Sequence, residues 1–134
     1  MVSLNFEDMW NDPIIRETDP GAILGGQLID LGNYCCVRVS HALMTAGHTI
    51  TQPSDFKDKY KRPYIIKCDT MDSYLRSKLG PPIGVSSSTA AGKRGIIFFK
   101  KRFRNATGHF DLFDGSSCAY SEYWDADDIY LWEL

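Results

Sequence analysis

Apolar residues recur at helical intervals in three stretches of the first 80 residues, and each stretch predicts a helix. The first lies within residues 5–15, where Pro13 limits it to a short helix. The second covers residues 34–46, with Asn33 as a favourable N-cap and Gly47 as the expected stop. Its apolar face is formed by Cys36, Val39, Leu43 and Ala46.

The third helix is predicted from Asp69, which can cap it, to the Gly-Pro-Pro sequence at 80–82 that ends it. Before it, residues 53–63 are polar, charged and bracketed by prolines, which indicates a surface loop. Residues 64–66 are predicted to form a short strand or a packed extended piece. After the third helix, the serine-rich residues 84–92 predict a flexible connection beside whatever cleft the protein contains.

From residue 95 onwards the pattern changes from helical to extended. Residues 95–99 are an uninterrupted apolar run, typical of a strand buried on both faces. A basic connector at 100–104 leads to a second strand within residues 108–113. The alternation in this strand predicts that one face carries His109, Asp111 and Phe113.

A hairpin is predicted after this strand, because Asp114-Gly115 is a strong signal for a two-residue turn. Residues 116–120 would then return beside the strand, and residues 128–132 predict a final strand. Helices followed by an antiparallel sheet make an α+β domain.

Length and composition bound the protein class. With 134 residues the chain is predicted to form a single domain, 1–134. A hydrophobic fraction of 43% and a charged fraction of 24% are ordinary for a globular protein, which excludes disordered and fibrous classes. We expect neither a secretory signal peptide nor a membrane-spanning segment, and thus a soluble protein made in the cytoplasm.

Charge is unevenly distributed along the chain. The net charge of −2 argues against a dedicated nucleic-acid binder. Residues 57–104, however, contain 13 basic and 3 acidic residues, whereas both flanks are acidic. The segments could neutralise each other on the folded surface. Alternatively, the protein could be a non-enzymatic binding module that holds an anionic partner through this basic middle segment.

Cysteine offers the most specific candidate chemistry. Of the four cysteines, Cys35 lies just after the predicted N-cap of the second helix, where backbone amides and the helix dipole favour a thiolate. The same amides can supply an oxyanion hole. Cys36 points toward the apolar stripe and is interpreted as a core side chain. For Cys118 the sequence leaves two possibilities open, a free thiol or a disulfide. A purely structural role for Cys35 is an equally open interpretation.

A cysteine nucleophile needs a general base, and only three histidines are available. His41 lies well over a turn along the same helix and His48 follows its terminating glycine, so neither can easily turn back. His109 lies on a predicted strand behind Gly108, which would leave open backbone beside it. A helix-borne cysteine facing a strand-borne histidine is the layout of papain-like thiol hydrolases.

Four sequence blocks carry a family resemblance. The run Gly32-Asn33-Tyr34-Cys35-Cys36-Val37-Arg38-Val39-Ser40 resembles the nucleophile helix of the type VI secretion amidase effectors of family four, in which Cys-x-x-Arg-x-Ser occupies this position. Agreement continues in order through residues 64–75, Gly95-Ile96-Ile97, and 108–118. Together the blocks cover most of the chain.

The resemblance implies a papain-like, NlpC/P60-like fold, with the nucleophile helix packed on the antiparallel sheet. It implies a peptidoglycan amidase that cleaves the γ-D-glutamyl–meso-diaminopimelate bond of the peptide stem and needs no metal or organic cofactor. Such effectors are made in the cytoplasm, injected by the type VI machinery and active in the recipient's periplasm, and a cognate immunity protein protects the producer. A papain-like site acting on protein substrates stays open.

Carried over by position, Cys35 is the nucleophile and His109 is the base that activates it. The family's third residue is an acid two positions after the cysteine of Gly-Ser-x-Cys, and here that position is Tyr120. Asp111 is the substitute that we expect to orient the imidazole. The alternatives are the Tyr120 hydroxyl, which the predicted two-residue turn would place opposite His109, and a solvated role for Asp111. Arg38 is expected to anchor its helix to nearby carbonyls or acids.

Overall fold

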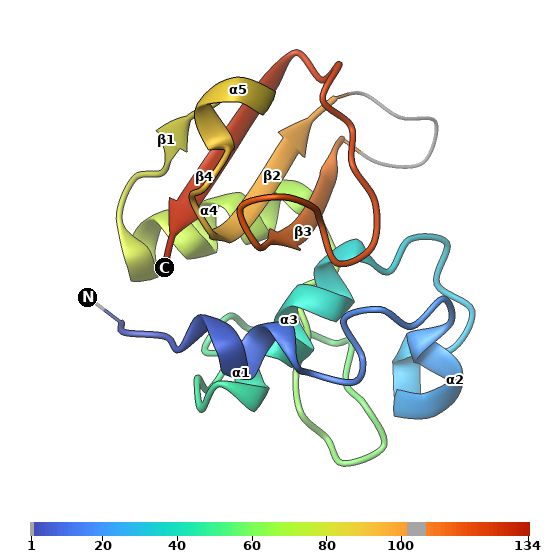
Figure 1. The fold of residues 1–134 in the computed structure, drawn as a ribbon. Coiled ribbons are helices and arrows are strands. Elements are labelled where there is room, and N and C mark those ends of the chain that lie inside the picture. The colour runs from blue at the N-terminus through green and yellow to red at the C-terminus, as the bar shows by residue number, and fades with distance from the viewer. Residues whose placement is uncertain (1, 102–106) are drawn as a thin grey trace.

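A computed structural model describes residues 2–101 and 107–134 of the chain. Figure 1 shows a sheet with its longer helices gathered at one side. The helices are α1 (Phe6–Trp10), α2 (Pro20–Leu24), the 3-10 turn η1 (Gly26–Leu28), α3 (Cys35–Thr45), α4 (Cys68–Leu79) and α5 (Ser87–Ala90). The strands are β1 (Ile83–Gly84), β2 (Gly95–Lys100), β3 (His109–Phe113) and β4 (Asp128–Glu133).

The four strands form one antiparallel sheet in the order β1-β4-β2-β3. β2 is central, so that Ile97 lies opposite both Asp111 of β3 and Leu131 of β4. Because β3 is an edge strand, its outer side is open to helix α3. The predicted α+β class with an antiparallel sheet is therefore confirmed, as are the strands expected at 95–99, 108–113 and 128–132.

The two faces of the sheet bury different sets of side chains. Alternate residues of β2 and β3, such as Phe98 and Phe110, pack against α1, α3 and α4 in the largest core cluster. The intervening residues, such as Ile97 and Phe99, pack on the other face against Ala90 of α5 and the segment before β4. His109 and Asp111 project on this second face, because they alternate with Phe110 along β3.

The two long helices form as predicted, but each begins next to a different residue than expected. Tyr34 occupies the N-cap of α3, and the Asn33 side chain instead accepts a hydrogen bond from the Cys35 amide at 3.1 Å. Lys67 occupies the N-cap of α4, which places Asp69 inside the first turn. There its negative charge interacts favourably with the positive end of the helix dipole. Both expected side-chain caps are thus wrong by a residue or two.

Two loop predictions also need correction. Residues 84–92 contain the end of β1 and the one-turn helix α5, which Ser86 and Thr89 hold in a reciprocal capping box. The hairpin after β3 closes with Phe113 paired to Cys118, and Asp114 NH donates to Ser117 O. Four residues therefore turn the chain instead of two.

Other segments follow the predictions more closely. Residues 53–63 are a loop, and residues 64–66 are an extended piece in which Tyr64 and Ile65 are buried. Residues 102–104 of the predicted basic connector lie outside the described residues. In the two described ranges no helix combines the length and apolar character needed to cross a bilayer.

Candidate active site

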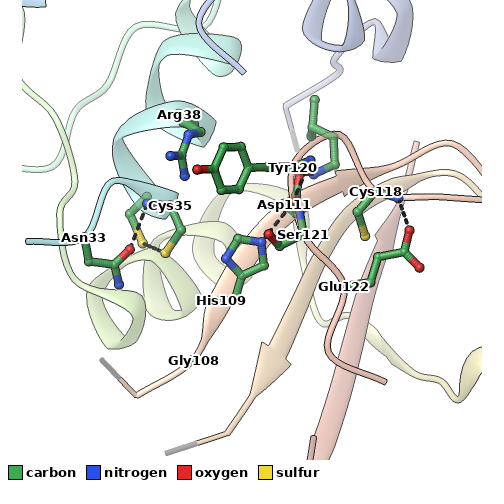
Figure 2. Close-up of polar contacts among 12 residues, drawn as sticks. Asn33, Cys35, Arg38, Gly108, His109, Asp111, Cys118, Tyr120, Ser121 and Glu122 are labelled. Carbon is green, nitrogen blue, oxygen red and sulfur yellow. Dashed lines mark hydrogen bonds and ion pairs between the residues drawn. The ribbon is translucent and has the colours of Figure 1, made fainter. Parts of the chain in front are cut away.

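The candidate site forms where the N-terminus of α3 meets the edge strand β3 (Figure 2). Cys35 is the first residue of α3 and His109 the first residue of β3, and both are almost completely buried. Figure 2 shows the His109 ring turned toward Cys35, and each side chain shifts the pKa of the other. The fold therefore brings together the two residues that the sequence analysis paired across more than seventy positions.

Asp111 completes a chain of contacts along β3. Its Oδ2 lies 2.8 Å from Nε2 of His109, and Figure 2 shows the other ring nitrogen turned toward Cys35. Asp111 is only 1% exposed, so the alternative of a solvated carboxylate is wrong. The two residues lie two positions apart on the same face of β3, and their hydrogen bond closes the distance between the side chains.

The surroundings hold the imidazole in one plane. Phe99, the β2 partner of His109, stacks on its ring at 6.2 Å between centroids, and Tyr123 contacts it edge-on at 5.2 Å. Such aromatic contacts restrict rotation about the His109 side-chain bonds. The ring is thus positioned by packing as well as by its hydrogen bonds.

The electrostatics of the site favour a thiolate facing an imidazolium. Hydrogen bonds from the Cys36 and Cys68 thiols, and then from His109, hold the pKa of Cys35 well below its ordinary value in spite of burial. Burial alone would lower the pKa of His109, but the hydrogen bonds to Asp111 and Cys35 outweigh it and raise this pKa to about 9. Both shifts favour an ion pair of thiolate and imidazolium over the neutral pair.

Asp111 also organises the chain that returns from the hairpin. Its carboxylate accepts hydrogen bonds from the backbone amides of Leu112 and Ser121 at 2.8 Å and of Tyr120 at 3.1 Å. Hydrogen bonds to a carboxylate are among the stronger ones in proteins. One buried side chain therefore links the imidazole to the segment that closes the site.

The position of Tyr120 differs from the predicted one because the hairpin register differs. With Phe113 paired to Cys118, residue 120 lies beside Asp111 and donates its amide to that carboxylate. Its ring covers the Arg38 guanidinium at 3.6 Å from the ring centroid. The Tyr120 ring thus contacts Arg38 of α3, and the side chain that accepts a hydrogen bond from His109 is that of Asp111.

Arg38 anchors α3 as predicted, since its Nε donates to Glu17 O at 2.8 Å.

The prediction that Gly108 leaves open backbone beside His109 is wrong. A Cβ at this position would lie 2.5 Å from Cε1 of Phe98 and 2.7 Å from the Phe99 carbonyl oxygen. The glycine therefore permits close packing at the start of β3 and leaves no open backbone.

Cys68, the first residue of α4, belongs to the site although no sequence pattern singled it out. Its sulfur lies 3.8 Å from Cys35 Sγ, 3.9 Å from Cys36 Sγ and 3.3 Å from Gly108 O, so its single S–H proton has both Cys35 and the Gly108 carbonyl within reach as acceptors. The only available signal was a cysteine just before the predicted third helix, and nothing in the spacing indicated that two helix N-termini converge. All four cysteines are free thiols.

The three sulfurs, all within 4.8 Å of one another, are a donor set that a soft metal ion could use. Burial, however, raises the pKa of Cys36, and the hydrogen bond to Cys35 raises that of Cys68. Two of the three are therefore held as neutral thiols. We assign the cluster to hydrogen bonding around a single thiolate.

The other two histidines have different partners, in agreement with the sequence analysis. Nδ1 of His41 lies 2.8 Å from Oδ1 of Asp12, and Nε2 of His48 contacts the Tyr74 hydroxyl. Both pairs lie away from the start of α3, because His41 and His48 follow Cys35 along and beyond the same helix.

Solved structures share this fold over the whole chain. A type VI effector–immunity complex, Tae4-Tai4 from Salmonella Typhimurium, matches with a TM-score of 0.87 at 27% identity over 99% of each chain. The Tae4-Tai4 complex from Enterobacter cloacae matches with a TM-score of 0.85 at 24% identity over 99% of each chain. The effector Tae4 alone from Enterobacter cloacae gives 0.84 at 25% identity, covering 99% of this chain and 98% of that one.

Among curated proteins no relative is found. The family described as type VI secretion system amidase effector protein 4, in contrast, matches residues 31–132, which contain all three residues of the contact chain. With that match over most of its length, the protein belongs to the family of type VI secretion system amidase effectors known as Tae4.

Proposed function

We propose that the protein is a cysteine amidase with a papain-like, NlpC/P60-like fold in a single domain of residues 1–134. Its substrate is the peptide stem of peptidoglycan, which it cuts at the γ-D-glutamyl–meso-diaminopimelate bond. The amidase character follows from the family. The observation that carries the catalytic assignment is the buried row of Cys35, His109 and Asp111, in which the imidazole faces Cys35 and hydrogen-bonds to Asp111.

The reaction uses the ion pair directly. The Cys35 thiolate attacks the amide carbonyl carbon, and the His109 imidazolium gives its proton to the leaving amine, which forms a thioester acyl-enzyme. The neutral imidazole then takes a proton from water, and hydroxide releases the acyl group and regenerates the thiolate. Asp111 keeps Nε2 protonated and thus presents the other nitrogen to sulfur and substrate.

The oxyanion of each tetrahedral intermediate is assigned to the first amides of α3. They lie beside the nucleophile at the positive end of the helix dipole. The Cys35 amide, which donates to Asn33 Oδ1, would exchange that acceptor for the substrate oxygen. Binding of substrate therefore requires a small rotation of the Asn33 side chain.

The biological context is extended from the relatives. Tae4 from Salmonella Typhimurium and from Enterobacter cloacae is seen in complex with the immunity protein Tai4. We infer that this protein likewise has a cognate immunity partner, is delivered by the type VI machinery and acts in the periplasm of the recipient bacterium. The mechanism uses no metal or organic cofactor.

The test is digestion of purified peptidoglycan followed by mass analysis of the muropeptides. The parent protein should release fragments that end at D-glutamate, with new amino groups on diaminopimelate. Cys35→Ala and His109→Ala should abolish release, whereas Cys118→Ser should retain it, because Cys118 lies on the far side of Asp111 from Cys35 (Figure 2). Cleavage at the parental rate by either folded alanine variant would refute the assigned roles.

The same preparation separates the alternatives. Iodoacetamide should inactivate a cysteine amidase, whereas a binding module that uses residues 57–104 should be insensitive to alkylation and should release its anionic partner steeply with salt. A protein substrate would be revealed by cleavage of denatured polypeptides at a rate comparable to that of peptidoglycan.

A further inference from the structure

The sulfur atom of Cys68 forms and breaks no bond in the proposed amidase reaction, although it lies in contact with the proposed nucleophile and helps to lower its pKa. Cys35 opens α3 and Cys68 opens α4, and the two helix N-termini converge so that the sulfurs are 3.8 Å apart. A disulfide has an S–S length of about 2.05 Å. Each sulfur therefore needs to move only about 0.9 Å to form one.

The two sulfurs differ in chemical state, which gives them distinct roles. Cys35 is the thiolate of the site, and a thiolate is the form that peroxides oxidise. Cys68 is a thiol whose sulfur lies 3.3 Å from the Gly108 carbonyl oxygen on one side and 3.8 Å from Cys35 Sγ on the other. Oxidation should therefore begin at Cys35.

Cys36 is the competing partner, because its sulfur is 3.9 Å from that of Cys35. A disulfide between adjacent residues, however, closes a small ring that contains their peptide bond and strains its planarity. Both residues also lie in the first turn of α3, which such a ring would distort. Cys68 on a separate helix carries no such constraint.

We infer that Cys68 is a resolving cysteine, which converts peroxide-oxidised Cys35 into a reversible Cys35–Cys68 disulfide that blocks the amidase. The inference rests on the proposed role of Cys35 as nucleophile. In the first step the Cys35 thiolate attacks a peroxide oxygen, which gives a sulfenic acid and hydroxide. In the second step the Cys68 sulfur attacks the Cys35 sulfur, and the sulfenic oxygen leaves as water with the Cys68 proton.

The two steps balance in electrons, because each of the two sulfurs loses one electron and one peroxide molecule gains two. A dithiol reverses the reaction by thiol–disulfide exchange and restores the thiolate. Without Cys68, further peroxide would carry Cys35 to sulfinic and sulfonic acids, which thiols do not reduce. The disulfide thus protects the nucleophile from permanent loss.

Trypsin separates the candidate partners and makes the test direct. It cuts after Arg16, Arg38, Lys67 and Arg76, so that Cys35 and Cys36 fall in peptide 17–38 and Cys68 falls in peptide 68–76. The full-length protein is treated with hydrogen peroxide, blocked with iodoacetamide and digested. We expect peptides 17–38 and 68–76 to be joined, in the parent and in Cys36→Ser alike.

Activity is followed on the same samples, each variant being compared with its own untreated sample. Peroxide should lower parental amidase activity by roughly tenfold or more, and a dithiol should restore most of it. In Cys68→Ser the loss should persist after the dithiol, with oxygen added to peptide 17–38. Cys118→Ser should behave as the parent does.

Three results would overturn the inference. The first is that peptide 68–76 stays unlinked after peroxide, and the second is a disulfide within peptide 17–38. The third is a recovery of amidase activity in Cys68→Ser that is as complete as in the parent. If Cys35→Ala is inactive while no cross-link forms, the resolving role fails and the proposed amidase stands. A cross-link that leaves activity unchanged would instead refute Cys35 as nucleophile, and the blocking role with it.

Discussion

Replacement of Asp111 by asparagine isolates what the buried carboxylate does for the site. An asparagine has almost the same shape, and its carbonyl oxygen can still accept from the Leu112 amide. Its NH2 group, however, would then face two donors, Nε2 of His109 and the Ser121 amide, both of which lie 2.8 Å from Oδ2. The variant keeps the packing and removes the acceptor.

The magnitude follows from the pKa of His109. The difference between its ordinary pKa of 6.5 and about 9 corresponds to roughly 3 kcal/mol of preference for the imidazolium. The hydrogen bond to Asp111 is the largest of the contributions that raise this pKa. Asp111→Asn should therefore lower kcat by about 10²–10⁴-fold, because the imidazole samples the wrong tautomer and loses its proton at neutral pH.

The assay is the pH dependence of kcat/KM for release of amino groups from peptidoglycan. In the parent the raised pKa keeps the imidazolium of His109 protonated until the pH rises through about 9, so activity should fall there. In Asp111→Asn that alkaline limb should move toward or below neutral pH. The unpaired donors should also cost about 2–4 kcal/mol of folding stability.

A destabilised variant elsewhere separates the two effects. Asp58 is another buried carboxylate, and Asp58→Asn should lower stability while the pH profile of activity keeps its parental alkaline limb. If Asp111→Asn also retained an alkaline limb near pH 9, Asp111 would not orient the imidazole, and the reasoning would be refuted.

Two further predictions concern stability. Burial raises the pKa of Asp58, but hydrogen bonds led by those from Arg62 outweigh it and lower this pKa, so the stabilisation is present above pH ~4 and lost as the pH falls through the folded-state pKa. Asp58→Asn should cost about 1–3 kcal/mol at pH 7 and flatten the acid side of a plot of Tm against pH. Gly108→Ala should lower both Tm and kcat, because its Cβ would clash with Phe98 and displace His109. Gly84→Ala, with open space around its Cβ, is the matched control, and equal Tm values for the two variants would contradict this account.

The sequence determined the elements that depend on local physics. Apolar spacing and the flanking glycines located α3 and α4, and the run at 95–99 located the central strand. Alternation placed His109 and Asp111 on one strand face, which was sufficient to propose their contact. These inferences hold because helix and strand periodicities operate over a few neighbouring residues.

Register was the first feature that local reasoning got wrong. Asp114-Gly115 signals a turn but does not determine how many residues close it, and the pairing of Phe113 with Cys118 depends on what the returning chain contacts. The Asp111 carboxylate accepts hydrogen bonds from three backbone amides, one in its own strand and two in the returning chain. These bonds determine the register in which the returning chain pairs with β3. A carboxylate that is removed from water must find hydrogen-bond donors in the protein. Only the folded interior removes Asp111 from water, so the local sequence could not reveal this requirement.

Convergence of distant segments was decided by tertiary structure alone. Cys68 carries no signal of its own at the start of a helix, and no periodicity relates it to Cys35, which lies 33 positions earlier on a different element. Their contact arises because α3 and α4 both bury apolar faces against the same side of the sheet, which brings their N-termini together beside β3. How those faces are buried depends on the whole core. The charge state of Cys35 therefore also depends on the whole core, because core packing brings Cys68 and His109 to it.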